Sequence, residues 1–134
     1  MAYRTMLDTN IVSDLMKNPT GKAAARLATE GEGGVCLSII SAAELRYDAA
    51  KKGSSNLVAR VEAILAEFDV LPFNVPADTQ YGRLRAKLEI AGQMIGPNDL
   101  LIAAHALTLD VTLATANLSE FSRVTGLRVE NWLA

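Results

Sequence analysis

Three carboxylates and one amide stand where short apolar runs of the chain give way to helical patterns. They are far apart in the sequence: Asp8, Glu44, Asp99 and Asn117. Clustered carboxylates repel one another, and burial raises the cost of their charges. A divalent cation would remove that cost, because hard cations take oxygen ligands. The set therefore indicates a site for Mg²⁺, with Mn²⁺ as the alternative.

A carboxylate-bound Mg²⁺ would give such a site a defined chemistry. It lowers the pKa of a bound water and stabilises the charge that develops on a phosphate oxygen, and two ions would hold both the attacking and the leaving oxygen. The reaction indicated is phosphodiester hydrolysis. The sequence contains no convincing Ser/His/Asp arrangement and no phosphate loop of the GxxxxGK[ST] form that would supply a different chemistry.

Each of the four residues also has a purely structural interpretation. Asp8 could be a helix N-cap, and Ser41 and Glu44 have the spacing of a capping box, in which Glu44 bonds the backbone N–H of Ser41. Asp99 suits the positive end of a helix dipole. Asn117 could be an ordinary turn residue. These interpretations weaken when the four residues are considered together, because a carboxylate cluster does not stabilise a fold by itself.

The hydrophobic pattern predicts the elements that must position these side chains. Strands are expected at 3–8, 35–40, 70–73, 111–115 and 127–130, and helices at about 10–16, 22–30, 41–52, 56–68, 77–91 and 98–109. Asn98 is expected to cap the last helix and to leave Asp99 facing the strand edge. Alternating strands and helices predict right-handed crossovers and an α/β fold, a three-layer α/β/α sandwich with a mostly parallel central sheet. The site would lie outside the carboxyl ends of the strands.

Composition excludes several classes of protein. The chain has 134 residues, of which 50% are hydrophobic and 21% charged, which fits one globular domain over residues 1–134. No apolar run spans a bilayer and no secretory signal opens the chain, so we expect a soluble cytoplasmic protein without membrane contact. A single histidine and a single cysteine argue against a zinc site. Cys36 is expected to be buried and unreactive, and His105, about 120° around the helix from Asp99, to be structural.

Four segments, in order, resemble the motifs of PIN-domain ribonucleases, and more narrowly of the VapC toxins of bacterial type II toxin–antitoxin systems, including the FitB-like branch. They are 6–10 (MLDTN), 41–45 (SAAEL), 96–104 (GPNDLLIAA) and 115–121 (TANLSEF), and the tail 124–132 (VTGLRVENW) is also similar. One DTN alone is a weak signal, whereas four motifs at these separations are specific. The resemblance covers essentially the whole chain and implies a PIN-like fold.

The resemblance also implies roles for individual residues. Asp8, Glu44 and Asp99 would be the metal-binding catalytic acids, with Thr9 and Thr115 as supports of the site. The family's fourth position is often Asp, whereas this chain has Asn117. An amide there implies a neutral ligand or a water-positioning group, and it leaves less negative charge for a second metal ion.

Partners follow from the same resemblance. It implies Mg-dependent cleavage of RNA, inhibition by a cognate VapB-type antitoxin that places a basic side chain in the acidic pocket, and a homodimer. Operator DNA would be contacted only through the antitoxin, which fits the net charge of −2. Arg83, Arg85 and Lys87 could contact RNA phosphates and make binding salt-sensitive, or they could be ordinary surface charges.

Two other functions stay open at this point. A HAD-like phosphatase would use Asp8 as a phosphorylated nucleophile, but such a site usually has a second Asp two residues later, where this chain has Asn10. A catalytically inactive PIN-fold module would bind RNA or protein without cleaving. Acids at all three expected positions argue against that module.

Overall fold

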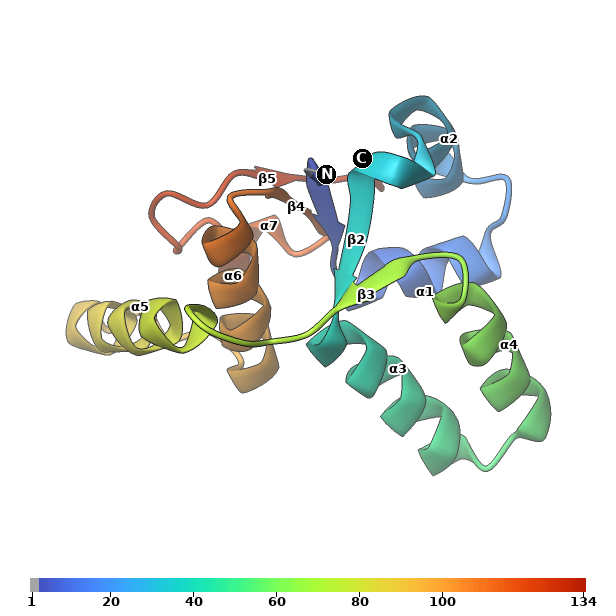
Figure 1. The fold of residues 1–134 in the computed structure, drawn as a ribbon, viewed down its shortest axis with the longest axis horizontal. Coiled ribbons are helices and arrows are strands. Elements are labelled where there is room, and N and C mark those ends of the chain that lie inside the picture. The colour runs from blue at the N-terminus through green and yellow to red at the C-terminus, as the bar shows by residue number, and fades with distance from the viewer. Residues whose placement is uncertain (1–2) are drawn as a thin grey trace.

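The computed structural model describes residues 3–134, except for the side chain of Glu32. A five-stranded sheet lies at its centre (Figure 1). The strands are β1 (Thr5–Leu7), β2 (Val35–Ser38), β3 (Asp69–Leu71), β4 (Thr112–Ala114) and β5 (Val129–Glu130). Their order is β3-β2-β1-β4-β5, and every neighbouring pair is parallel. The predicted α/β class and the parallel sheet are confirmed.

Helices cover both faces of this sheet. They are α1 (Thr9–Lys17), α2 (Lys22–Glu30), α3 (Ile39–Lys52), α4 (Ser55–Leu65), α5 (Ala77–Ala91), α6 (Pro97–Leu109) and α7 (Leu118–Phe121), with a 3₁₀ turn η1 at Glu32–Gly34. Successive strand side chains point to opposite faces. Met6 accordingly packs in one apolar cluster with α5 and α6, and Leu7 packs in a second with α1, α3 and α4. These are the three predicted layers.

The strand order places a switch point beside β1. From β1 the chain proceeds to β2 and β3 on one side, and it then crosses to β4 and β5 on the other. Leu7 is in register with Leu37 of β2 and with Ala114 of β4, so the carboxyl ends of these three strands lie level. In open parallel sheets a ligand site forms at such a point. Asp8, directly after β1, stands at it.

Two predicted helix starts are wrong, and in both cases a different residue caps the helix. The hydroxyl of Ser38 accepts the backbone N–H of Ile40 at 3.1 Å, so α3 begins at Ile39 and the strand before it ends earlier than expected. Ser41 therefore lies inside the helix, where its buried hydroxyl has no partner among the described residues. The capping-box interpretation of Glu44 falls with it, and the carboxylate is free for another role.

The start of α6 differs for a different reason. Gly96 is the N-cap and Pro97 the first helical residue, a position that proline favours because its missing N–H would have no partner there anyway. Asn98 lies within the first turn and is not the cap. The helix expected over 56–68 ends at Leu65. The short elements η1 and α7 were not predicted.

Two residue-level expectations agree with the structure. Cys36 is buried in the sheet, and burial raises the pKa of its thiol to about 12. His105 is buried away from the acids, with Nδ1 2.8 Å from Ser38 Oγ and its ring edge-on to Phe73. Burial also lowers the pKa of His105. Across residues 3–134, no helix has the combined length and apolar character that crossing a membrane requires.

Candidate active site

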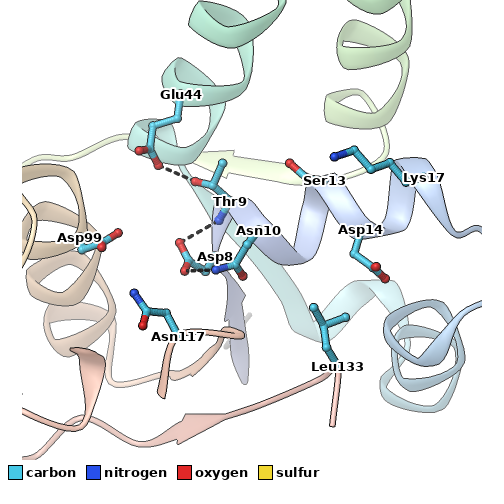
Figure 2. A pocket seen from close by; sticks show the side chains of 10 residues that line it. All are labelled: Asp8, Thr9, Asn10, Ser13, Asp14, Lys17, Glu44, Asp99, Asn117 and Leu133. Atoms are coloured by element: carbon cyan, nitrogen blue, oxygen red, sulfur yellow. Dashed lines mark hydrogen bonds between the residues drawn. The ribbon is translucent and has the colours of Figure 1, made fainter. Parts of the chain in front are cut away.

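A pocket of about 490 Å³ lies at the carboxyl ends of β1 and β4 (Figure 2). Its walls come from the whole length of α1, from α3 and α6, and from two C-terminal segments. The lining residues are Asp8, Thr9, Asn10, Ser13, Asp14, Lys17, Glu44, Asp99, Asn117 and Leu133. All four sequence-predicted site residues are among them, although more than 100 positions separate the first from the last.

Asp8 is almost completely buried, with 3% of its surface exposed, yet both of its carboxylate oxygens are bonded. The backbone N–H of Thr9 donates to Oδ1 at 2.8 Å. The Thr115 hydroxyl and the Asn10 amide donate to Oδ2 at 2.8 and 3.2 Å. Burial raises the pKa of Asp8, while the hydrogen bonds from Thr115 and Thr9 act against that rise. Asp8 is also the N-cap of α1, so its structural and chemical interpretations hold together.

Glu44 reaches the pocket from α3 and is held at both oxygens. The Thr9 hydroxyl donates to Oε1 at 2.5 Å, and the Asn98 amide donates to Oε2 at 3.1 Å. Thr9 thus bonds Asp8 through its backbone and Glu44 through its side chain. The junction of β1 with α1 and the first turn of α6 together set the position of an acid on a third element.

Asp99, in the first turn of α6, has a different environment because its side chain hydrogen-bonds another carboxyl, that of Glu120. Burial raises the pKa of Asp99 first, and the Glu120 hydrogen bond and the charges of Asp8, Glu120 and Glu44 raise it further, to about 7. Two adjacent carboxylates cannot both be ionised cheaply, so one keeps a proton. The raised pKa of Asp99 and the lowered pKa of Glu120 favour Asp99 as the group that keeps it below about pH 7.

Glu120 is a site residue that the sequence reasoning missed. Its Oε1 accepts the backbone N–H of Gly96 at 2.6 Å, and its Oε2 accepts the Asn117 amide at 2.7 Å. Burial alone would raise the pKa of Glu120, but the bonds from Gly96, Asp99 and Asn117 together lower it. Glu120 lies in the first turn of α7, as Asp99 lies in the first turn of α6. A carboxylate at that position of a helix was the signal in the sequence.

Asn117 and Thr115 complete the arrangement after β4. The Thr115 hydroxyl donates to Asp8 and accepts the backbone N–H of Asn117 at 2.9 Å. Because the amide nitrogen of Asn117 bonds Glu120, its Oδ1 is the atom available to a ligand. That oxygen receives only a long bond, 3.4 Å, from the Ser119 hydroxyl.

The donor chemistry of the pocket fits a hard divalent cation. Its polar walls offer carboxylate and amide oxygens, which such ions prefer. Burial and the neighbouring carboxylates raise the pKa of Asp99 to about 7, and a cation binding there would favour its charged form and displace a proton from it. In residues 3–134, no three Asp, Glu, His or Cys side chains already converge as ligands on one point. The metal-ligand assignment therefore stays a prediction.

Comparison with known proteins decides the family. The protein-family model described as the PIN domain matches residues 5–127. A protein named ribonuclease VapC2, from Haemophilus influenzae, is 37% identical over 96% of this chain and 97% of its own length. A protein named tRNA(fMet)-specific endonuclease VapC, from Shigella flexneri, is 37% identical over 95% of this chain and 96% of its own. This chain belongs to the VapC family of PIN-domain proteins.

Solved structures of VapC relatives share its fold. The DNA-bound VapBC complex from Salmonella typhimurium contains a chain that matches with a TM-score of 0.90 and 34% identity, covering 97% of this chain and 98% of that one. The FitAcB complex from Neisseria gonorrhoeae gives a TM-score of 0.84 at 29% identity, covering 96% and 97%. The predicted PIN-like sandwich is therefore confirmed as the fold.

The basic residues singled out on α5 of this VapC-family chain do not reach the pocket. Arg83, Arg85 and Lys87 lie on α5, and none of them lines the pocket. Arg85 is paired with Glu89 at 3.2 Å and also bonds the Tyr81 hydroxyl at 3.1 Å. The basic side chain that does line the pocket is Lys17, which the sequence reasoning did not consider.

Proposed function

We propose that this chain is the toxin of a type II toxin–antitoxin system and that it is a Mg²⁺-dependent endoribonuclease, with Mn²⁺ as a substitute ion. One observation carries the proposal. Four polar residues that resemble the PIN-domain motifs line a single pocket at the switch point of the sheet, and they are Asp8, Glu44, Asp99 and Asn117. The printed names of the relatives, ribonuclease and tRNA(fMet)-specific endonuclease, support RNA as the substrate class.

In this proposal the three acids and the Asn117 amide oxygen hold the metal. When bound, the ion lowers the pKa of a water and neutralises charge on the scissile phosphate. The chain's own residues keep the ligands in place. Thr115 and Thr9 fix the Asp8 carboxylate, and Thr9 with Asn98 fixes Glu44. Such supporting hydrogen bonds orient metal ligands, and their loss typically lowers metal affinity or activity about 10- to 100-fold.

We propose partners on the same basis. Two relatives of known structure are the VapBC complex of Salmonella typhimurium, which is bound to DNA, and the FitAcB complex of Neisseria gonorrhoeae. This chain would accordingly bind a VapB-type antitoxin, meet operator DNA only through it, form a homodimer and act in the cytoplasm, with residues 1–134 as one PIN domain. The carboxylates of the pocket suit a basic antitoxin side chain, which would compete with the metal.

Cleavage of RNA tests the proposal. Purified protein is incubated with total tRNA in Mg²⁺, Mn²⁺ or EDTA, beside the variants Asp99→Asn and Asp78→Asn. Asp78 is a matched control because it is an exposed acid in the first turn of α5, outside the pocket. We expect metal-dependent cleavage that Asp99→Asn abolishes and Asp78→Asn retains. Cleavage by Asp99→Asn at the parent rate would refute the site.

The same preparation separates the two alternatives. A phosphoryl group trapped on Asp8 would favour the phosphatase. Failure to bind Mg²⁺ or Mn²⁺ in a calorimetric titration, with the Asp8, Glu44 and Asp99 triple alanine variant as control, would favour the inactive module.

A further inference from the structure

One face of α1 carries a row of polar side chains that runs away from the acids. Thr9, Ser13 and Lys17 are spaced four residues apart, so they lie on the same side of the helix. All three line the pocket, with Thr9 beside the acids and Lys17 at the far end (Figure 2). At 1.5 Å per residue the row is about 12 Å long. The buried residues of α1 occupy other positions: Ile11, Val12 and Leu15.

The lining of the pocket contains four carboxylates and one basic group, the Lys17 ammonium. Three of the carboxylates gather at the Thr9 end of the row, whereas the fourth, Asp14, lies on α1 three residues before Lys17. Lys17 is exposed and forms no ion pair with any residue that the structure describes. The length of α1 keeps Lys17 away from Asp8 and Glu44, so its charge is available to an anionic ligand that also reaches the acids.

Further basic groups lie just beyond Lys17. Ser13 and Lys17 also line a second hollow, between α1, α3 and α4, which contains Arg60 and a Lys52 that is ion-paired with Asp48 at 3.2 Å. Lys17 lines a third, at the end of α1, together with Lys22. The Arg60 guanidinium is held at this end by a 3.0 Å bond to the Met16 carbonyl. The far end of the row therefore carries Lys17 with Lys22 and Arg60 nearby, and one carboxylate, Asp14, beside them.

We infer that the Thr9–Ser13–Lys17 row is a binding track for the RNA backbone, in which Lys17 binds a phosphate adjacent to the scissile one. The inference rests on the proposed function. A phosphodiester backbone suits both ends of the row, because metal-neutralised acids would hold one phosphate and an ammonium group another. The Thr9 hydroxyl already donates to Glu44, so the Ser13 hydroxyl is the group of the row between the two ends that suits a sugar or phosphate oxygen, whereas a partner helix would need an apolar stripe there.

Binding of RNA to an inactive parent tests this track. Fluorescence anisotropy with a labelled single-stranded RNA is measured at several salt concentrations for Asp99→Asn, alone and combined with Lys17→Met, Lys17→Arg or Lys87→Met. Lys87 is the matched control, because it is an exposed lysine of α5 outside the pocket. Lys17 is exposed, so these variants should fold, and their melting curves check that they do.

We expect Lys17→Met to weaken binding roughly tenfold at low salt. The slope of log affinity against log salt should become shallower by about 0.7, the value for one phosphate contact on a single strand. Lys17→Arg should keep both the RNA affinity and the salt slope of the Asp99→Asn protein, and Lys87→Met should change neither of them. In the active protein, Lys17→Met should raise KM and leave kcat unchanged.

Each other outcome has a clear meaning. If the unsubstituted protein neither binds nor cleaves RNA with any metal ion, the proposed function fails and the track fails with it. If Asp99→Asn binds RNA and adding Lys17→Met leaves its affinity and salt slope the same, the track alone is wrong. If Lys17→Met instead weakens only the complex with a co-expressed antitoxin, the row is a protein-binding surface and the inference is overturned.

Discussion

The two halves of the pocket hold their carboxylates in opposite ways. On one side Asp8 is buried, but three donors from the chain satisfy it. On the other side Asp99 faces Glu120, and the raised pKa of Asp99 with the lowered pKa of Glu120 makes the protonated Asp99 carboxyl the donor between them. Burial raises the pKa of both Asp8 and Asp99. Hydrogen bonds lower the pKa of Asp8 against the effect of burial, whereas at Asp99 every contribution raises the pKa. The fold therefore stabilises the charge of Asp8, and the charge of Asp99 requires a cation.

This difference explains why the same class of residue should respond differently to substitution, metal and pH. An acid fixed by hydrogen bonds contributes to stability as well as to chemistry. An acid that must share a proton contributes little to stability at neutral pH, and its charge becomes useful only when a cation is present. The predictions below probe this contrast, from the largest expected effect to the smallest.

Replacing each acid by its amide should separate stability from activity. Asp99→Asn and Asp8→Asn should each lower the cleavage rate by about 10³-fold or more, because each removes a metal ligand. Asp99→Asn should unfold no more easily than the parent, since an amide N–H can donate to Glu120 as the carboxyl proton does. Asp8→Asn should lower the free energy of unfolding by about 1–3 kcal/mol, because its NH₂ group would face the donors that now bond the carboxylate and would find no acceptor.

Single-turnover cleavage and urea unfolding at neutral pH measure both quantities. Equal loss of stability in the two variants would remove the contrast between the halves.

Removing one support of Asp8 should have a smaller effect. Thr115→Val deletes the hydroxyl that donates to Asp8 and accepts from Asn117, with almost no change of shape. We expect Mn²⁺ affinity to fall about 10- to 100-fold, as for other residues that orient metal ligands. Thr108→Val is the matched control, because its hydroxyl bonds a carbonyl within α6, away from the pocket. Calorimetric titration of Mn²⁺ measures the change, and equal affinities for the two valine variants would contradict it.

The pH dependence of stability should report Asp99 directly. Its pKa in the folded protein, about 7, lies above its ordinary value of 3.8. The folded state therefore binds the proton more tightly, and the stability this gives is complete below the ordinary value and lost as the pH rises through about 7. The lowered pKa of Glu120 acts in the opposite sense, with stability lost as the pH falls.

In EDTA, the parent should lose more stability than Asp99→Asn as the pH rises from about 4 to 8, as measured by urea unfolding. Adding Mn²⁺ should restore the stability of the parent at about pH 8. Parallel curves for the parent and Asp99→Asn would show that Asp99 ionises normally.

The basic residues of α5 should matter least. Arg85→Gln removes a charge that is already paired with Glu89, and Arg83 and Lys87 lie outside the pocket. We expect each substitution to change RNA affinity by less than about twofold, because exposed or paired charges contribute little. Anisotropy titrations alongside Lys17→Met make the comparison. An effect at α5 as large as that at Lys17 would place RNA on a different face.

The sequence predicted which polar residues share one pocket better than it predicted the local boundaries of the elements. Asp8 and Asn117 could be found because polar residues at the ends of parallel strands must share an edge, whatever the details of the helices. The start of α3 could not be found in this way, because Ser38 and Ser41 are both competent caps. Both are fully buried in the fold, but the Ser38 hydroxyl accepts the Ile40 N–H and also pairs with His105 Nδ1, whereas the Ser41 hydroxyl has no partner among the described residues.

Glu120 and Lys17 were missed for related reasons. Glu120 lies in a helix of four residues, which is too short for a periodic pattern to reveal. The spacing of Thr9, Ser13 and Lys17 was visible in the sequence. Which side of α1 faces the pocket, however, depends on how that helix packs against the sheet, and only the assembled fold shows it.

The proton that Asp99 holds allows the most direct test of a divalent-ion site in this pocket. Calorimetric titration of Mn²⁺ at about pH 7, in two buffers of different ionisation enthalpy, counts the protons released per ion bound. We predict roughly half a proton per ion for the parent, because Asp99 is about half protonated there. Asp99→Asn should bind far more weakly or release none. Binding to the parent without proton release, or no binding at all, would contradict the account.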